Sequence, residues 1–182
     1  MYKLQSYTLR NILVQGAVRY YKRPAIALIG NAPLSYREIG LRAAEFIKRL
    51  ETLGIGAEEK VVLLSENKPE WVIAYLAITA SGRIVVPILT DFHPEQIQNI
   101  IKHSEACILV VSEKLKSKIR GSTVPVVISI ESILKEPIGT LPDKKLLEEL
   151  LNKQFPPIDE TRIAAILYTS GTTGHSKGVM LT

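Results

Sequence analysis

Short, wholly apolar runs recur along this chain, and they constrain its fold more than any other feature. The runs at 61–64, 84–88, 107–111 and 126–130 consist almost entirely of aliphatic residues and have the length of strands. Strands that expose one face alternate polar and apolar residues, whereas wholly apolar strands are covered on both faces. The sequence therefore predicts an α/β fold, with a mostly parallel sheet and helices on both of its faces.

Helical segments occupy the intervals between these strands. Ser35 and Glu38 have the spacing of a capping box, and the apolar stripe behind them predicts a helix that ends near Gly54. Pro69 suits the first turn of a helix over 71–81, which is apolar nearly all round and should be buried. Further helices are predicted over 8–21, 94–103 and 114–120, and a short strand over 25–29.

The segment 134–160 differs in character from the rest of the chain. It is mainly polar, is interrupted by prolines, and predicts one short helix near 144–151. We therefore predict an N-terminal α/β subdomain over 1–133, a connecting segment over 134–160, and the beginning of a further part over 161–182.

The composition indicates which kinds of partner the chain could bind and in which cellular compartment it is expected. The formal net charge of +5 is compatible with an anionic partner, but the basic residues are dispersed and not interleaved with aromatics, which argues against nucleic-acid binding. Cys107 is the single cysteine and lies in an apolar run, which is typical of a buried thiol. The first residues lack the apolar stretch of a signal peptide, and the longest apolar run is too short to cross a bilayer. A cytoplasmic location is expected.

A segment rich in glycine, serine and threonine follows the predicted strand 163–168. It reads TSGTTGHSKG over residues 169–178. Glycines allow successive backbone N–H groups to face one concavity, and hydroxyls and a lysine add further donors for phosphate oxygens. The composition therefore favours a polyphosphate-binding loop, with an ordinary surface turn as the alternative.

The spacing of this loop is not that of a Walker A motif. Two residues, rather than four, separate Gly171 from Gly174, and Lys177 is followed by glycine rather than by serine or threonine. The loop must therefore belong to another kind of phosphate site.

Residues 168–182, which read YTSGTTGHSKGVMLT, resemble the signature of the adenylate-forming (AMP-binding) superfamily. That superfamily contains acyl-CoA synthetases, adenylation domains of peptide synthetases, and luciferases. Ser176 departs from it, because the family commonly has proline there. The resemblance continues upstream, in the same order as in the family, over 34–38, 53–56, 62–71 and 80–87. Residues 66–71, followed by 75–77, are most similar to long-chain fatty acyl-CoA synthetases.

The resemblance implies an enzyme that uses ATP with Mg²⁺ to activate a carboxylic acid as acyl-AMP. The similarity to long-chain synthetases implies that this acid is a long-chain fatty acid. The acyl group is then transferred to coenzyme A. The resemblance implies that Thr169 lies near the magnesium ion, and it assigns no catalytic residue within the chain. The residues that match the family's ATP phosphate-binding positions are Thr169, Ser170, Gly171, Thr172, Thr173, Gly174 and Lys177.

The family's later motifs lie downstream of this loop, so the resemblance implies that the chain is the N-terminal part of such a synthetase and is inactive alone. Two alternatives remain: a non-catalytic remnant that binds nucleotide or a partner, and another adenylating enzyme of the superfamily. The expected partners are ATP, the acid and coenzyme A, without nucleic acid; peripheral membrane association is compatible with the sequence. We also expect the chain to self-associate as a dimer through the strand 164–168, an exposed edge strand whose apolar faces require cover.

Overall fold

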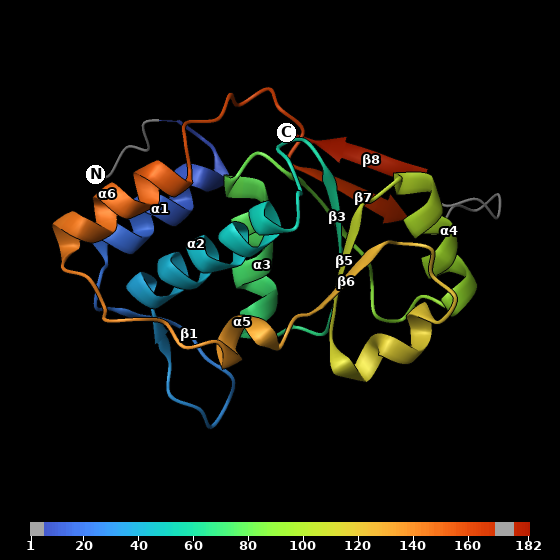
Figure 1. The fold of residues 1–182 in the computed structure, drawn as a ribbon, viewed down its shortest axis with the longest axis horizontal. Coiled ribbons are helices and arrows are strands. Elements are labelled where there is room, and N and C mark those ends of the chain that lie inside the picture. Colours follow the sequence, from blue (N-terminus) through green and yellow to red (C-terminus); the bar gives the residue numbers. More distant parts are fainter. Residues whose placement is uncertain (1–5, 170–176) are drawn as a thin grey trace.

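A computed structural model describes residues 6–169 and 177–182, and its centre is a six-stranded sheet (Figure 1). The strands lie in the order β6-β5-β3-β4-β7-β8, so the chain begins the sheet at its middle and extends it in both directions. Their bounds are β3 (Lys60–Leu64), β4 (Ile84–Pro87), β5 (Ile108–Val111), β6 (Val126–Ser129), β7 (Ala165–Thr169) and β8 (Lys177–Leu181).

Strand pairing is parallel from β6 through β7, and only β8 runs antiparallel. The predicted α/β fold with a mostly parallel sheet is therefore confirmed. The strand 164–168 was expected to lie at the sheet edge, and this was wrong: all five residues of β7 are paired with β8. The exposed edge is β8 itself, whose five residues are all exposed.

Helices cover both faces of the sheet, as the apolar strands require (Figure 1). Within β3, Val61 and Leu63 belong to one core, while Val62 and Leu64 belong to the other. The first core is covered by α1 (Leu9–Arg19), α2 (Tyr36–Thr52), α3 (Pro69–Ala80), α5 (Ser132–Lys135) and α6 (Lys144–Gln154). The second is covered by α4 (Pro94–Ser104) and the 3₁₀ helix η1 (Glu113–Ile119).

The limits of α2 follow from local chemistry. The Ser35 hydroxyl accepts a hydrogen bond from the backbone N–H of Glu38, and the Glu38 carboxylate accepts from the backbone N–H of Ser35 at 2.7 Å. This is the predicted capping box. At the other end Gly54 adopts a φ of +78°, which glycine tolerates better than other residues.

Two predicted elements differ in the structure. The strand predicted over 25–29 is shorter: β1 (Pro24–Ile26) pairs antiparallel with β2 (Leu34–Ser35) in a separate two-stranded sheet. The basic segment predicted as a helix over 114–120 is the 3₁₀ helix η1. There the Lys118 ammonium donates to the backbone carbonyl of Thr90 at 2.6 Å, which anchors η1 to the loop after β4.

The polar segment 134–160 contributes to the first core through α6. Leu147, Leu151 and Phe155 are fully buried and pack against α1 and α2. Arg10 of α1 donates to the backbone carbonyl of Phe155 at 2.9 Å, which ties the end of α6 to α1. No helix in the described part of the chain is long and apolar enough to cross a membrane.

Candidate phosphate-binding site

The two ends of the predicted phosphate-binding loop lie side by side. Thr169, the last residue of β7, is the register partner of Lys177, the first residue of β8. Because β7 is parallel to β4, Thr169 lies at the carboxyl edge of the parallel strands, where α/β sheets place their ligands. The structure thus places the two residues that begin and end the candidate site opposite each other on paired strands.

Thr169 and Lys177 are both exposed. No ion pair to Lys177 occurs among residues 6–169 and 177–182, so its charge is accessible to an anionic ligand. The remaining predicted phosphate-binding residues lie outside the described residues: Ser170, Gly171, Thr172, Thr173 and Gly174.

Tyr168 anchors the strand that leads into the loop. Its side chain is buried, and its hydroxyl lies 2.8 Å from Nδ1 of His103 in the last turn of α4. The two rings also meet edge to face, with centroids 5.7 Å apart. Burial raises the pKa of the Tyr168 phenol, which keeps it protonated and able to donate to the imidazole.

Gly178 allows β8 to approach this tyrosine. A Cβ atom at position 178 would lie 3.2 Å from Cζ of Tyr168 and 3.0 Å from Cγ2 of Ile166. Any larger residue would require the Ile166 side chain and the Tyr168 ring to shift by a few tenths of an ångström. The glycine after the lysine therefore has a packing role, in addition to any freedom it gives the loop.

An ion pair lies at the same carboxyl end of the parallel strands, after β3 and β6. Lys68 at the start of α3 forms an ion pair of 2.6 Å with Glu131, which follows β6. Partial burial raises the pKa of the Glu131 carboxyl, but hydrogen bonds from Lys68 and Ser129 outweigh it and lower the pKa to about 2. No local sequence pattern predicts this pair, because its two residues lie 63 positions apart in the chain.

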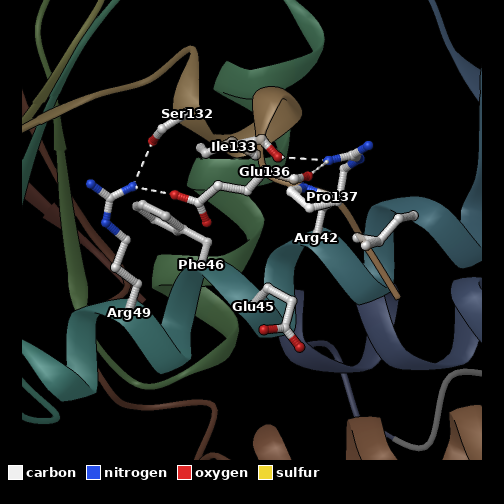
Figure 2. A pocket seen from close by; sticks show the side chains of 9 residues that line it. Arg42, Glu45, Phe46, Arg49, Ser132, Ile133, Glu136 and Pro137 are labelled. Carbon is white, nitrogen blue, oxygen red and sulfur yellow. Dashed lines mark hydrogen bonds and ion pairs between the residues drawn. The ribbon is translucent and has the colours of Figure 1, made fainter. Parts of the chain in front are cut away.

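A small pocket between α2 and α5 contains two arginines but does not offer them to a ligand (Figure 2). Arg42 donates to the backbone carbonyl of Ile133 at 2.8 Å. Arg49 donates to the hydroxyl of Ser132 and to the carboxylate of Glu136, each at 2.8 Å. Both guanidinium groups are thus engaged in fastening α5 to α2, and the pocket is a structural contact.

Within the described residues, no three or more His, Cys, Asp or Glu side chains are grouped to hold a metal ion. Magnesium in nucleotide sites is held largely by phosphate oxygens and water, with few protein ligands. Thr169 is exposed and its hydroxyl is an oxygen ligand of the kind that magnesium takes singly, and its role near the ion stays a prediction.

These features define a class of α/β protein that has a glycine-, serine- and threonine-rich segment at the carboxyl end of its parallel strands. The segment has phosphate-binding composition and is followed by a lysine. A family profile described as "AMP-binding enzyme" matches residues 14–182. The chain belongs to this family of AMP-binding enzymes.

Its relatives include enzymes of two kinds. Tyrocidine synthase 3 of Brevibacillus parabrevis is 30% identical over 158 residues, which are 86% of this chain and 2% of the relative. Fatty acyl-CoA synthetase A of Dictyostelium discoideum is 26% identical over 163 residues, covering 82% of this chain and 24% of the relative. The chain therefore spans a quarter or less of the length of these relatives.

Solved structures share the fold. The inhibitor-bound N-terminal domain of FACL13 from Mycobacterium tuberculosis superposes with a TM-score of 0.77 at 22% identity, covering 95% of this chain and 44% of that one. The N-terminal subdomain of Klebsiella oxytoca NpsA, bound to 3-hydroxyanthranilyl-AMSN, gives a TM-score of 0.74 at 20% identity, covering 95% and 40%. The chain thus has the fold of part of such N-terminal domains.

Proposed function

We propose that this chain is the N-terminal part of an enzyme that activates a carboxylic acid with ATP as acyl-AMP and then transfers the acyl group to a thiol. The observation that carries the proposal is the pairing of Thr169 with Lys177 at the carboxyl edge of the sheet, in a chain of the AMP-binding family. This pairing places the two residues that flank 170–176 at the carboxyl end of the parallel strands, where α/β sheets bind their ligands.

In the proposed reaction, an oxygen of the substrate carboxylate attacks the α-phosphorus of ATP. The bond from that phosphorus to the bridging oxygen breaks, and pyrophosphate leaves with the electron pair. Lys177 and the donors of the loop, Thr172 among them, would hold the β- and γ-phosphates and stabilise the charge that develops on them. Thr169 would contribute one ligand to the Mg²⁺ that accompanies ATP. The thiol then attacks the acyl carbon, and AMP leaves.

The acid that we favour is a long-chain fatty acid and the thiol that of coenzyme A. The similarity of 66–71 to long-chain synthetases supports this choice, as does the relative named fatty acyl-CoA synthetase A. The second candidate is an amino acid, because tyrocidine synthase 3 and a linear gramicidin synthase, also from Brevibacillus parabrevis, are each 30% identical to this chain. Pyrophosphate exchange with fatty acids and with amino acids, in a longer protein that carries this chain, distinguishes the two.

Substitutions test the role of the loop in that longer protein. Lys177→Ala and Thr172→Ala should each lower adenylate formation by ~10²–10³, while leaving the transfer of a preformed acyl-adenylate to the thiol nearly unchanged. The reason is that pyrophosphate has left before the thiol attacks. Lys153→Ala, at an exposed lysine of α6, is the matched control and should leave both steps unchanged. Equal losses in both steps would contradict the assigned role.

The chain alone should not catalyse acid-dependent exchange between pyrophosphate and ATP, because the family's later motifs are absent from residues 1–182. Exchange above background with any fatty acid or amino acid would overturn this expectation. Weak nucleotide binding without exchange, in the longer protein as well, would instead favour the non-catalytic remnant.

A further inference from the structure

The β1–β2 hairpin presents its loop away from the body of the molecule, at the lower edge of the view in Figure 1. The loop is ordered by a tight turn, in which the backbone N–H of Asn31 donates to the carbonyl of Leu28 at 3.0 Å. Gly30 has a φ of +87°, the conformation that a type II turn requires at its third position. Ile29 therefore occupies the outer corner of a defined turn.

The tip of this hairpin is apolar and exposed. Ile29 is fully exposed and Leu28 is nearly half exposed, although both are large aliphatic side chains. Ala27, Ala32 and Pro33 are exposed as well. No charged residue occurs from Pro24 to Tyr36. Single exposed aliphatic residues are common, but two adjacent ones held at the corner of a projecting, uncharged turn indicate a contact surface.

Basic and aromatic side chains surround the base of the hairpin. Lys22 and Arg23 are exposed immediately before β1. The Arg23 guanidinium lies 5.5 Å from the ring centre of Tyr20, and that of Arg37 lies 4.7 Å from the ring centre of Tyr21. Tyrosine, lysine and arginine around an apolar tip are the side chains that proteins place at the level of lipid headgroups.

One acidic residue, Glu38, lies near the hairpin in sequence, and its negative charge acts on that of Arg37. Glu38 is engaged by the backbone N–H and the hydroxyl of Ser35 in the capping box of α2, and these hydrogen bonds keep it facing the helix. Lys22, Arg23 and Arg37 outnumber this one carboxylate, so the base of the hairpin carries a net positive charge, complementary to an anionic surface.

We propose that the β1–β2 hairpin docks this chain on anionic phospholipid membranes, with Leu28 and Ile29 inserted among the acyl chains and Lys22 and Arg23 against the headgroup phosphates. Apolar insertion and electrostatic attraction to anionic lipid act together in such interfacial binding, which is reversible. The inference does not rest on the proposed function, because docking requires neither ATP nor an acid.

Co-sedimentation with vesicles tests the proposal. One set of vesicles is phosphatidylcholine alone, and the other contains an equal share of phosphatidylglycerol. The chain should sediment with the anionic vesicles, and less so at high salt. The double variant Leu28→Ser with Ile29→Ser should lower the partition coefficient about tenfold. The double variant Lys22→Gln with Arg23→Gln should lower it about 25-fold, since each basic residue near the surface contributes about fivefold.

Matched controls distinguish docking by the hairpin from non-specific attraction of the whole chain to anionic vesicles. Leu89→Ser removes another exposed leucine, and Lys48→Gln with Lys116→Gln changes the net charge equally at exposed sites elsewhere. Both should bind as the unchanged chain does. The proposal is overturned if the chain does not bind anionic vesicles, or if the controls lose as much binding as the hairpin variants. It is also overturned if the hairpin variants abolish dimers in the absence of lipid while vesicle binding is nil, because the tip would then be a protein contact.

Discussion

The ion pair of Lys68 with Glu131 should stabilise the fold in a way that depends measurably on pH. Lys68 is the N-cap of α3, where a positive charge opposes the helix dipole, and the Glu131 carboxylate offsets it at 2.6 Å. The same carboxylate accepts from the hydroxyl of Ser129 at 2.8 Å and from the backbone N–H of Glu113 at 3.3 Å. Both charged side chains are 18% exposed, so this pair is better shielded than the others at the surface.

The magnitude follows from the pKa of Glu131. Partial burial raises this pKa, but the hydrogen bonds lower it from 4.5 to about 2. Because the folded-state pKa lies below the unfolded one, the stabilisation is fully present above the unfolded value and is lost as pH falls through the folded value. The shift corresponds to roughly 3 kcal/mol, which solvent screening of a partly exposed pair reduces to about 1–2 kcal/mol.

The test is Glu131→Gln, which preserves shape but removes the negative charge. We expect the free energy of unfolding at neutral pH to fall by about 2 kcal/mol, because Lys68 loses its counter-charge. The difference from the unchanged chain should shrink as pH falls from 4.5 towards about 2. Urea unfolding followed by the fluorescence of Trp71, the single tryptophan, measures both quantities.

Other carboxylates are protonated over the same pH range. The test is therefore the difference in the free energy of unfolding between the Glu131→Gln chain and the unchanged chain at each pH. Glu149→Gln, on the exposed face of α6, is the control and should change the free energy of unfolding by less than about 0.5 kcal/mol. A difference between the Glu131→Gln and unchanged chains that stays constant from neutral to acid pH would refute the reasoning. So would the absence of any loss at neutral pH.

Three further predictions concern packing and association. His103→Leu should destabilise the fold by ~1–3 kcal/mol and speed amide exchange in β7 and β8, because it leaves the buried Tyr168 hydroxyl unpaired. His103→Asn, which keeps an acceptor, should retain much of the stability; equal losses in both variants would contradict a hydrogen-bonding role. Gly40→Ala should lower the urea midpoint despite a better helix former, since its Cβ would lie 2.9 Å from Cβ of Ala17; a raised midpoint would show that α1 and α2 can separate. The isolated chain should self-associate through the exposed β8, and Val179→Lys should weaken this in light scattering; a monomer at every concentration would disprove it.

The candidate site could be predicted from sequence only in part. The composition of 169–178 is a local property and predicts a phosphate-binding loop without reference to the rest of the chain. The support of that loop is not local, because His103 lies 65 residues before Tyr168 and belongs to a different helix. A lone histidine near the end of a helix carries no signal that it will meet a tyrosine of a distant strand.

Local sequence patterns predicted the helices, the strand candidates and the layered α/β class. These depend on hydrophobic periodicity and on caps such as that of Ser35 and Glu38, where every interacting group lies within one or two helical turns. Burial on both faces also follows from wholly apolar strands, because water on either face would be unfavourable. The capping box of α2 and the buried α3 were accordingly predicted close to where they occur.

The strand order, the antiparallel edge strand β8 and the partners of the buried polar groups depend on contacts between distant segments. Arg83 illustrates the reason. Composition alone places an arginine at the surface, yet this side chain is 4% exposed and donates to the backbone carbonyl of Ile55. Burial lowers the pKa of its guanidinium, although Glu51 and Glu59 oppose that shift. Such contacts arise from packing between segments distant in sequence, and no local pattern specifies which segments will meet.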